Sequence, residues 1–330
     1  MPSTSEISST RPAFEARPFA IMHVAAVDPT PPERTWLVDK LWLASGVGIL
    51  AGHAKCGKTF MAVELATAVA GNTPALGCFK PAQSGSVLFY GAEDSLPALR
   101  TRFEGLAKIK GLLLKDLPVY LLAINSLRLD KQADLHRLRA TIAALSPRLL
   151  VLDPFVRMAN IDENSAADVA AVLASLRDIQ RTYDIAIILV HHARKSPAAH
   201  PMQAFRGSSD FSAWSDTNMH LARKTSRLVL SIEHRSAPAP EPLALVLRAE
   251  PAPHMVVLDA QQNQQDNTTT NDTLTGEIQA MLQASARPLT TVDIRQRLAK
   301  RKADVVAALE QLRAQGVLQR QVNGWMLEKP

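Results

Sequence analysis

One short stretch combines residue types that could bind phosphate groups. Residues 52–59 match the pattern G-x-x-x-x-G-K-[ST]. The glycines let backbone amides approach phosphate oxygens, Lys58 can neutralise their charge, and the Thr59 hydroxyl suits Mg²⁺. We expect a nucleoside triphosphate to be held here by nine residues: Gly52, His53, Ala54, Lys55, Cys56, Gly57, Lys58, Thr59 and Phe60.

The flanking residues supply the elements that such a loop requires. Val47, Ile49 and Leu50 form an apolar run typical of a buried parallel strand. Residues 60–70 then predict a helix that Gly71 should end. A strand, a glycine-containing loop and a helix N-terminus in this order direct the loop amides and the helix dipole at the phosphates. The alternative is a plain glycine turn with a solvated lysine.

Three further polar residues end other predicted strands. Glu93 follows residues 84–91, Asp153 ends residues 148–153, and His192 follows residues 185–190. Because the carboxyl ends of parallel strands meet at one edge of a sheet, we expect these side chains near the phosphate loop. Asp153 suits Mg²⁺ binding, commonly through water, Glu93 suits a general base or water-orienting group, and a neutral His192 could sense the γ-phosphate.

Each of these three residues also has an ordinary structural interpretation. Asp153 could cap the following helix. Glu93 could be a solvated loop carboxylate beside Asp94. His192 could be a core histidine with satisfied hydrogen bonds, which is the role that we expect for His191. The shared position at strand ends favours the functional interpretation of Asp153 and Glu93, and it leaves both interpretations of His192 open.

The order of the predicted elements indicates an α/β fold. Further strands are expected at 84–91, 117–123, 148–153 and 185–190, with helices reaching about residue 108 and covering 130–145 and 164–182. Alternating strands and helices predict a mostly parallel sheet with right-handed crossovers. After about residue 216 the pattern changes to short consecutive strands, which predict an antiparallel extension at 217–222, 227–233, 243–249 and 255–259.

The chain divides into four parts by composition. Residues 1–33 are rich in proline, serine and threonine and are interpreted as a mostly disordered arm. Residues 34–260 form the α/β domain, and the polar tract 261–272 is a linker. Residues 273–330 predict three helices and a hairpin around Asn323-Gly324, which is the pattern of a winged helix–turn–helix domain.

The C-terminal unit carries a basic cluster over residues 295–302. The cluster leads into the predicted third helix, where a recognition helix would meet DNA phosphates. We favour DNA as its partner. The alternative is a module for protein interaction with an ordinary basic face.

Composition sets broad limits on function. The net charge of +6, from 37 basic and 31 acidic residues, permits a nucleic-acid partner without requiring one. The two cysteines, Cys56 and Cys78, predict neither a disulfide framework nor a metal site. No apolar run approaches the roughly 20 residues of a membrane helix, and the start of the sequence lacks the features of a secretion signal. We therefore expect a cytoplasmic protein.

Taken together, the motifs resemble those of RecA-like ATPases grouped with RepA, the hexameric replicative helicases of plasmids. The resemblance covers about residues 34–250 and rests on six segments: residues 52–59, Ala92–Asp94, Leu150–Asp153, Asp162–Asn164, Val190–Lys195 and Arg206–Ser209. The phosphate loop is generic, whereas the other segments are narrower signals. The winged-helix unit is additional to the minimal core of that family.

The resemblance implies ATP and Mg²⁺ as ligands, a homo-oligomeric ring, most simply a hexamer, and DNA as partner. It also implies that Glu93 activates water, that His192 reports on the γ-phosphate, and that Arg206 enters the site of a neighbouring subunit. Arg235 is a second candidate for the inter-subunit arginine. The alternative for either arginine is a surface salt bridge.

Two functions of different classes therefore remain open. The first is a ring-forming ATPase that translocates along DNA as a replicative helicase of a mobile element. The second is a nucleotide-gated DNA-binding protein, regulatory or of a recombination type, that does not unwind duplex DNA. A small-molecule kinase is a more distant third, because the sequence identifies no acceptor pocket.

Overall fold

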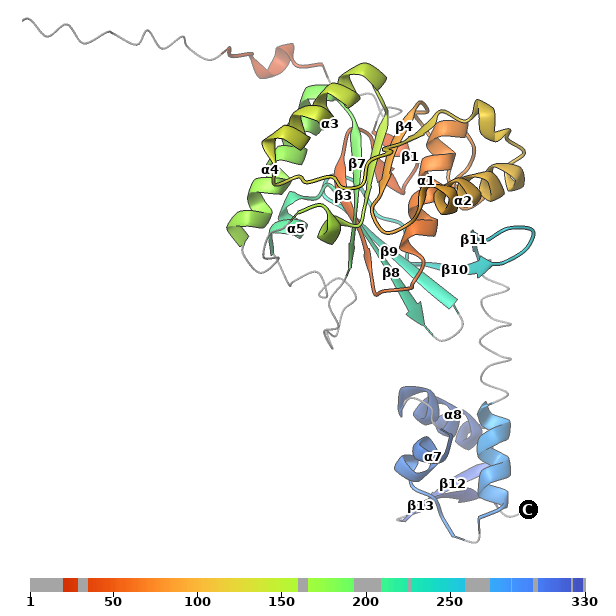
Figure 1. Cartoon of the computed structure of the whole chain (residues 1–330). Coiled ribbons are helices and arrows are strands. Elements are labelled where there is room, and N and C mark those ends of the chain that lie inside the picture. Colours follow the sequence, from red (N-terminus) through yellow and green to blue (C-terminus); the bar gives the residue numbers. More distant parts are fainter. Residues whose placement is uncertain are drawn as a thin grey trace, which may run out of the picture.

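The computed structural model describes most of the 330-residue chain, and Figure 1 shows its course. The described residues are 20–28, 35–159, 166–192, 209–224, 227–258, 274–285, 287–298, 302–321 and 323–328. Within the predicted N-terminal arm, these include a three-residue 3₁₀ helix, η1 (Val24–Ala26). The rest of the disorder prediction for residues 1–33 falls largely outside the described residues.

A nine-stranded sheet forms the centre of the described α/β part, in the order β11-β10-β9-β8-β3-β7-β6-β4-β5. All neighbours from β8 to β5 are parallel, while β9, β10 and β11 continue from β8 in antiparallel fashion. The predicted parallel sheet and its antiparallel extension are therefore confirmed. The strands are β3 (Val47–Gly52), β4 (Val87–Gly91), β5 (Val119–Leu121), β6 (Leu149–Asp153), β7 (Ala186–His192), β8 (Thr217–Lys224), β9 (Arg227–His234), β10 (Leu243–Arg248) and β11 (His254–Val257).

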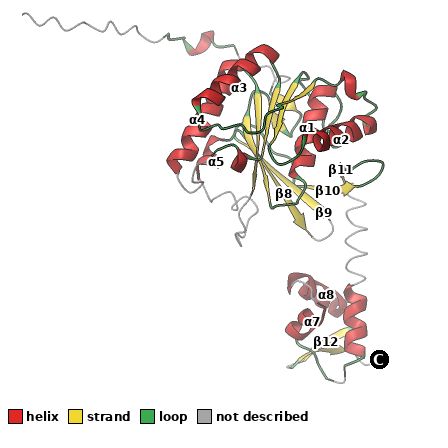
Figure 2. Ribbon diagram, in the orientation of Figure 1, coloured by secondary structure: helices red, strands yellow, loops and turns green. Residues whose placement is uncertain are grey.

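Helices cover both faces of this sheet (Figure 2). On one face, α1 (Lys58–Gly71) and α2 (Leu96–Ile109) bury one apolar cluster, and the 3₁₀ helix η3 (Leu114–Asp116) packs against it. On the other face, α3 (Gln132–Leu145), α4 (Ala166–Tyr183) and α5 (Ser209–Trp214) bury a second cluster with the turn η4 (Phe155–Arg157). The central strands are buried on both faces, which explains their continuous apolar sequences.

A small hairpin precedes the sheet and was not predicted from the sequence. It pairs β1 (Trp36–Val38) with β2 (Trp42–Leu43), and Trp42 is fully buried. The indole of Trp42 lies over the backbone of Gly48 in β3, where an added Cβ would meet the Thr217 carbonyl oxygen at 2.0 Å. Glycine at position 48 therefore allows the strands and the hairpin to approach closely.

Several element ends differ from the sequence prediction by a few residues, and two of the differences have a clear local cause. The helix α1 includes Gly71 as its last residue, and it is capped instead by Asn72, whose φ of 48° and N–H bond to the Ala68 carbonyl close the last turn. Asparagine tolerates the left-handed conformation, so it can take the position expected for glycine. The strand β7 extends through His191 and His192, because both residues continue the parallel pairing with β3.

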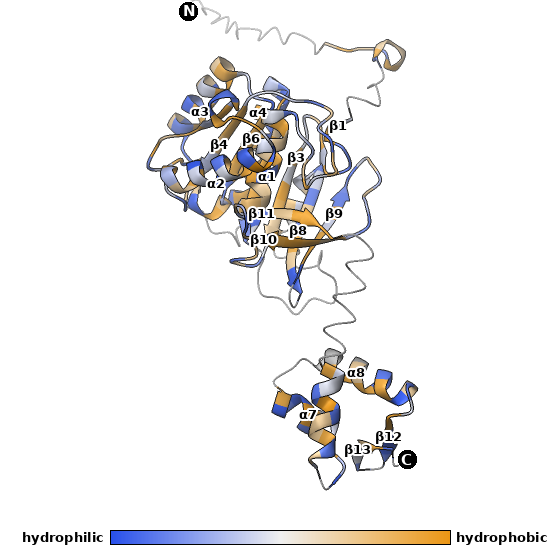
Figure 3. Ribbon diagram, turned by 90° about the vertical axis from the view of Figure 1, so that its right-hand side faces the viewer, coloured by the Kyte–Doolittle hydropathy of each residue, from blue (hydrophilic) through white to orange (hydrophobic). Residues whose placement is uncertain are grey.

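The C-terminal unit has an apolar core of its own. It contains a helix over residues 274–283, α7 (Thr291–Leu298), α8 (Lys302–Ala314), and a hairpin of β12 (Leu318–Gln321) and β13 (Gly324–Leu327). Figure 3 shows that hydrophobic and hydrophilic residues alternate along these elements. Three helices and a hairpin agree with the predicted elements, and the winged-helix interpretation stays a prediction.

Candidate active site

The loop between β3 and α1 requires glycine at two positions. Gly57 has a φ of 97°, which disfavours any side chain. A Cβ on Gly52 would lie 2.3 Å from the Leu221 carbonyl oxygen and 2.7 Å from Sγ of Cys56. Burial raises the pKa of the Cys56 thiol, so this side chain packs as a small apolar group rather than as a thiolate. His53, Ala54 and Lys55 form the exposed crest of the loop.

Lys58 is held inside the loop by main-chain and side-chain acceptors. Its Nζ donates to the carbonyl oxygens of Gly52 (2.9 Å) and His53 (3.0 Å) and lies 3.1 Å from Nδ1 of His192. Burial lowers the pKa of Lys58, whereas Cys56, Asp153 and Glu93 favour its charged form. A desolvated ammonium group in an otherwise amide-rich loop suits an incoming phosphate.

Thr59 and Asp153 meet at the start of α1. The carboxylate of Asp153 is 6% exposed and accepts a hydrogen bond from the Thr59 side chain. Burial raises the pKa of Asp153 to about 6, and the bond from Thr59 partly opposes that effect. A buried carboxylate in this state gains from a nearby cation.

Glu93 reaches the same edge of the sheet from the loop after β4. The register of β4 with β6 places Gly91 beside Asp153, so Glu93 projects close to the end of β6. Oε1 of Glu93 accepts a hydrogen bond from Nε of Arg157 at 3.1 Å, and Oε2 lies 3.9 Å from Nε2 of His192. The side chain is 46% exposed, which leaves it accessible to water.

The two histidines at the end of β7 have different surroundings. His192 pairs in register with Gly52 and points to the Lys58 side of the sheet. Burial and the nearby Lys58 charge lower the pKa of His192, so the imidazole is neutral near pH 7. His191 packs with the rings of Phe155 and Phe211 on the opposite face. This packing agrees with the structural role expected for His191.

The donor set fits a magnesium nucleotide. A hydroxyl from Thr59 and a buried carboxylate from Asp153 are the oxygen ligands that Mg²⁺ favours, directly or through water. Lys58 and the loop amides at the start of α1 fit the phosphates. The structure brings Lys58, Thr59, Glu93, Asp153 and His192 together at one edge of the sheet, and their catalytic or ligand roles stay proposals.

Phe60 lies beside an arginine that sequence reasoning did not select. The guanidinium carbon of Arg102 sits 4.8 Å from the centroid of the Phe60 ring, and Arg102 pairs with Asp94 at 2.8 Å. These contacts join the first turn of α1 to α2.

Of the two candidate inter-subunit arginines, the structure describes the surroundings of only one, Arg235. Arg206 lies outside the described residues. Arg235 follows β9 at the amino edge of the parallel strands, where Nη1 is 3.6 Å from Asp216 and Nη2 donates to the Ala213 carbonyl. Asp216 accepts from the Val47 amide at the start of β3, so Arg235 is at the end of that strand remote from Lys58.

Arg157 is the main site residue that sequence reasoning missed. It lies in η4, four residues after Asp153. The only available signal was a charged residue shortly after a strand that already ended in a candidate ligand. Its partner Glu93 is 64 residues away, so sequence spacing alone does not reveal the ion pair.

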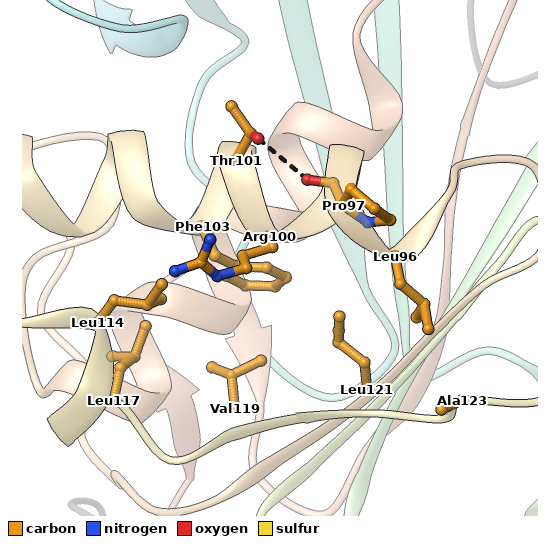
Figure 4. Close-up of a pocket in the computed structure, with 10 residues that line it drawn as sticks. All are labelled: Leu96, Pro97, Arg100, Thr101, Phe103, Leu114, Leu117, Val119, Leu121 and Ala123. Atoms are coloured by element: carbon orange, nitrogen blue, oxygen red, sulfur yellow. Dashed lines mark hydrogen bonds between the residues drawn. The ribbon is translucent and has the colours of Figure 1, made fainter.

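A separate apolar pocket lies between α2 and the β5 edge (Figure 4). Its volume is about 600 Å³, and it contains none of the predicted site residues. Leucine, valine and phenylalanine side chains dominate its lining, with Arg100 and Thr101 from α2.

Comparison with known families agrees with this geometry. A family model described as an AAA domain matches residues 13–198, which is more than half of the 330-residue chain. The chain belongs to this AAA domain family. The strand order and the phosphate loop identify the domain as a RecA-like P-loop ATPase domain. The match begins inside the segment that we expected to be an arm.

Two solved structures are similar at low identity. One is a DnaB-like replicative helicase, described with its interactions with primase, with a TM-score of 0.49 and 13% identity over 66% of this chain and 58% of that chain. The other is the RadB recombinase, with a TM-score of 0.47 and 15% identity over 66% of this chain and 92% of that chain. The match thus spans little more than half of the helicase chain.

The described part of the chain shows neither a membrane-spanning helix nor a metal site built from protein side chains alone. None of the helices described there has the length and apolar character needed to span a bilayer. The same residues contain no group of three or more histidine, cysteine or carboxylate side chains arranged to hold a metal by themselves. A two-oxygen site completed by nucleotide and water is a different case.

Proposed function

We propose that this protein is a Mg²⁺-dependent ATP hydrolase. The observation that carries the proposal is the meeting of Lys58, Thr59 and Asp153 with Glu93 and His192 at one sheet edge. Asp153 and His192 end parallel strands, Glu93 lies in the loop after β4, and Lys58 and Thr59 begin the helix that follows the β3 loop. Ligands of open α/β sheets bind at this edge.

The residues would act as follows. Lys58 and the loop amides bind the β- and γ-phosphates, and Thr59 and Asp153 hold Mg²⁺, which neutralises phosphate charge when bound. Glu93 accepts a proton from the attacking water or orients that water. The neutral His192 exchanges its contact with Lys58 for one with the γ-phosphate.

We further propose that the subunits form a ring that acts on DNA, in the manner of a RepA-like replicative helicase of a mobile element. The motif set from Ala92–Asp94 to Arg206–Ser209 supports this assignment. An arginine supplied by a neighbour, Arg206 or Arg235, would complete each site. The C-terminal unit, with its exposed Arg295 and Arg297, would add affinity for DNA as a winged-helix domain.

The second candidate is a nucleotide-gated DNA-binding protein without unwinding activity. The ion pair of Glu93 with Arg157 favours slow hydrolysis in the isolated subunit, because it engages the proposed base. This candidate shares the ATP site and differs in what hydrolysis accomplishes.

A forked-duplex strand-displacement assay, run beside an ATPase assay, separates the two. Displacement that requires ATP and is lost in Glu93→Gln would establish a helicase. ATP hydrolysis with DNA binding but no displacement would establish the second candidate. If the wild type hydrolyses no ATP in either assay, the proposed ATPase activity itself is contradicted.

A further inference from the structure

The turn that carries Arg157 is held by buried packing, while the Arg157 side chain extends into solvent. Phe155, two residues earlier, is fully buried and stacks edge-on against Phe211, and the Met158 amide closes the turn by donating to the Phe155 carbonyl. The Arg157 side chain, by contrast, is 63% exposed. An anchored turn thus presents a solvent-exposed guanidinium at the edge of the sheet that holds the phosphate loop.

Arg157 engages Glu93 with only part of its hydrogen-bonding capacity. Nε donates to Oε1 of Glu93 at 3.1 Å. Among the described residues, no hydrogen bond or ion pair involves its two Nη groups. A guanidinium has five N–H donors, so within the described part of the chain four are not used by Glu93 or by another side chain.

The contact affects the residue proposed to handle the attacking water. Oε1 of Glu93 is engaged by Arg157, and Oε2 faces His192 at 3.9 Å, which in turn contacts Lys58. A water that is to be activated at Oε1 therefore competes with the Arg157 N–H for that oxygen, and the ion pair restrains the direction in which the carboxylate points. Exposed ion pairs contribute little to folding stability, so this pair can break at low cost and can restrain Glu93 reversibly.

We propose that Arg157 is a positioning residue that restrains Glu93 until a phosphate of the DNA backbone binds the guanidinium. The inference rests on the proposed ATPase function. Phosphate oxygens match the planar guanidinium better than a single carboxylate oxygen does, because two N–H groups can donate together. DNA binding then frees Glu93 for water, and the same side chain that binds DNA controls hydrolysis.

The test compares steady-state ATP hydrolysis by wild type, Arg157→Ala and Arg157→Lys, with and without single-stranded DNA. Without DNA, Arg157→Ala should raise kcat about two- to fivefold, the range that an exposed ion pair can support, with KM for ATP unchanged. DNA should stimulate the wild type and stimulate Arg157→Ala much less. Arg157→Lys should restore most of the restraint, because the observed contact uses a single donor.

Two further measurements separate this role from general damage. DNA affinity of Arg157→Ala, measured against salt concentration, should show a slope shallower by about one phosphate contact. Arg139→Ala is a matched control, since a guanidinium N–H of Arg139 likewise donates to one carboxylate oxygen, that of Asp178 at 2.7 Å, in a pair between α3 and α4. It should leave both basal and DNA-stimulated rates unchanged.

The outcomes are distinct. An unchanged or lower basal kcat in Arg157→Ala, or full DNA stimulation in that variant, would overturn the inference while leaving the ATPase proposal standing. A wild type that hydrolyses ATP without any response to DNA would overturn it as well. A wild type that does not hydrolyse ATP at all would refute the proposed function, and this inference with it.

Discussion

Nζ of Lys58 lies 3.1 Å from Nδ1 of His192, which joins the start of α1 to the end of β7. Because an ammonium group has no acceptor, Nδ1 must accept this hydrogen bond and the imidazole must be neutral there. The lowered pKa of His192, caused first by burial, agrees with that state. A nucleotide must draw Lys58 away from this contact, so binding and rearrangement of His192 are coupled.

Lys58 and Glu93 should fail in different ways when they are changed. Lys58→Ala removes a phosphate contact used in both the ground state and the transition state, so ATP affinity and turnover should both fall. Glu93→Gln keeps shape but removes the base, so ATP should bind with turnover reduced about 10²-fold or more. Equilibrium binding of a fluorescent ATP analogue beside steady-state hydrolysis measures both effects. Near-normal turnover in Glu93→Gln would remove that residue from the proposed role.

Asp153 should make the metal-free protein less stable as pH rises. Its folded pKa of about 6 exceeds the ordinary aspartate value of 3.8, so the folded chain binds more protons than the unfolded chain between these pH values. The stability contributed by protonation is present below pH 3.8 and is lost as pH rises through about 6. Denaturant unfolding of wild type and Asp153→Asn should show a pH-dependent difference of about 3 kcal/mol at most.

The same carboxylate should make Mg²⁺-ATP binding weaker in acid. Protonation competes with the metal for Asp153, so affinity should decline as pH falls below about 6. Asp153→Asn should bind weakly with little dependence on pH. An identical pH dependence in both proteins would show that another group controls metal binding.

The C-terminal unit should contribute DNA affinity rather than catalysis. Its separate apolar core predicts that truncation at about Asn267 leaves a folded ATPase with unchanged DNA-free turnover. DNA binding should weaken and its salt dependence should become shallower, because fewer phosphates are neutralised. In the full chain, the double variant Arg295→Ala, Arg297→Ala should make the salt dependence of DNA affinity shallower by about two phosphate contacts. The same affinity and slope after truncation would indicate a protein-interaction module.

A site shared between subunits should be restored by mixing defective proteins. Lys58→Ala retains Arg206 and could lend it to a neighbour that carries Arg206→Ala, so mixtures should recover part of the activity. An arginine of this kind contributes about 10³–10⁵ in rate in other NTPases. Arg235→Ala mixed with Lys58→Ala tests the other candidate.

Mixing Lys58→Ala with Glu93→Gln provides the negative control. These two residues lie in the same site, on one chain, so every site in this mixture lacks one of them and no activity should be recovered. Absence of recovery with both arginine variants, in proteins shown to exchange subunits, would favour a self-contained ATPase.

The sequence predicted the elements whose signals are local. The apolar runs of β3, β6 and β7 are continuous because both faces are buried, and each ends in a residue of the site. Topology then places Asp153 and His192 near Lys58, since parallel strands share an edge. The α/β domain and most of the predicted site positions could therefore be obtained without coordinates.

Contacts between distant side chains could not be obtained in that way. Arg157 meets Glu93 only because β4 and β6 are neighbours in the sheet. Asp216 joins Arg235 and the Val47 amide through the pairing of β3, β8 and β9. The β1–β2 hairpin was missed because two very short strands carry no periodic signal.

The separation of Arg235 from Lys58, at opposite ends of β3, gives each subunit a front and a back. If Arg235 serves a neighbour, subunits must stack in one direction, with a different surface on each side of every contact. An open row then always leaves its last phosphate loop without a donor, whereas a closed ring leaves none. Counting working sites per subunit would thus report whether the assembly has closed.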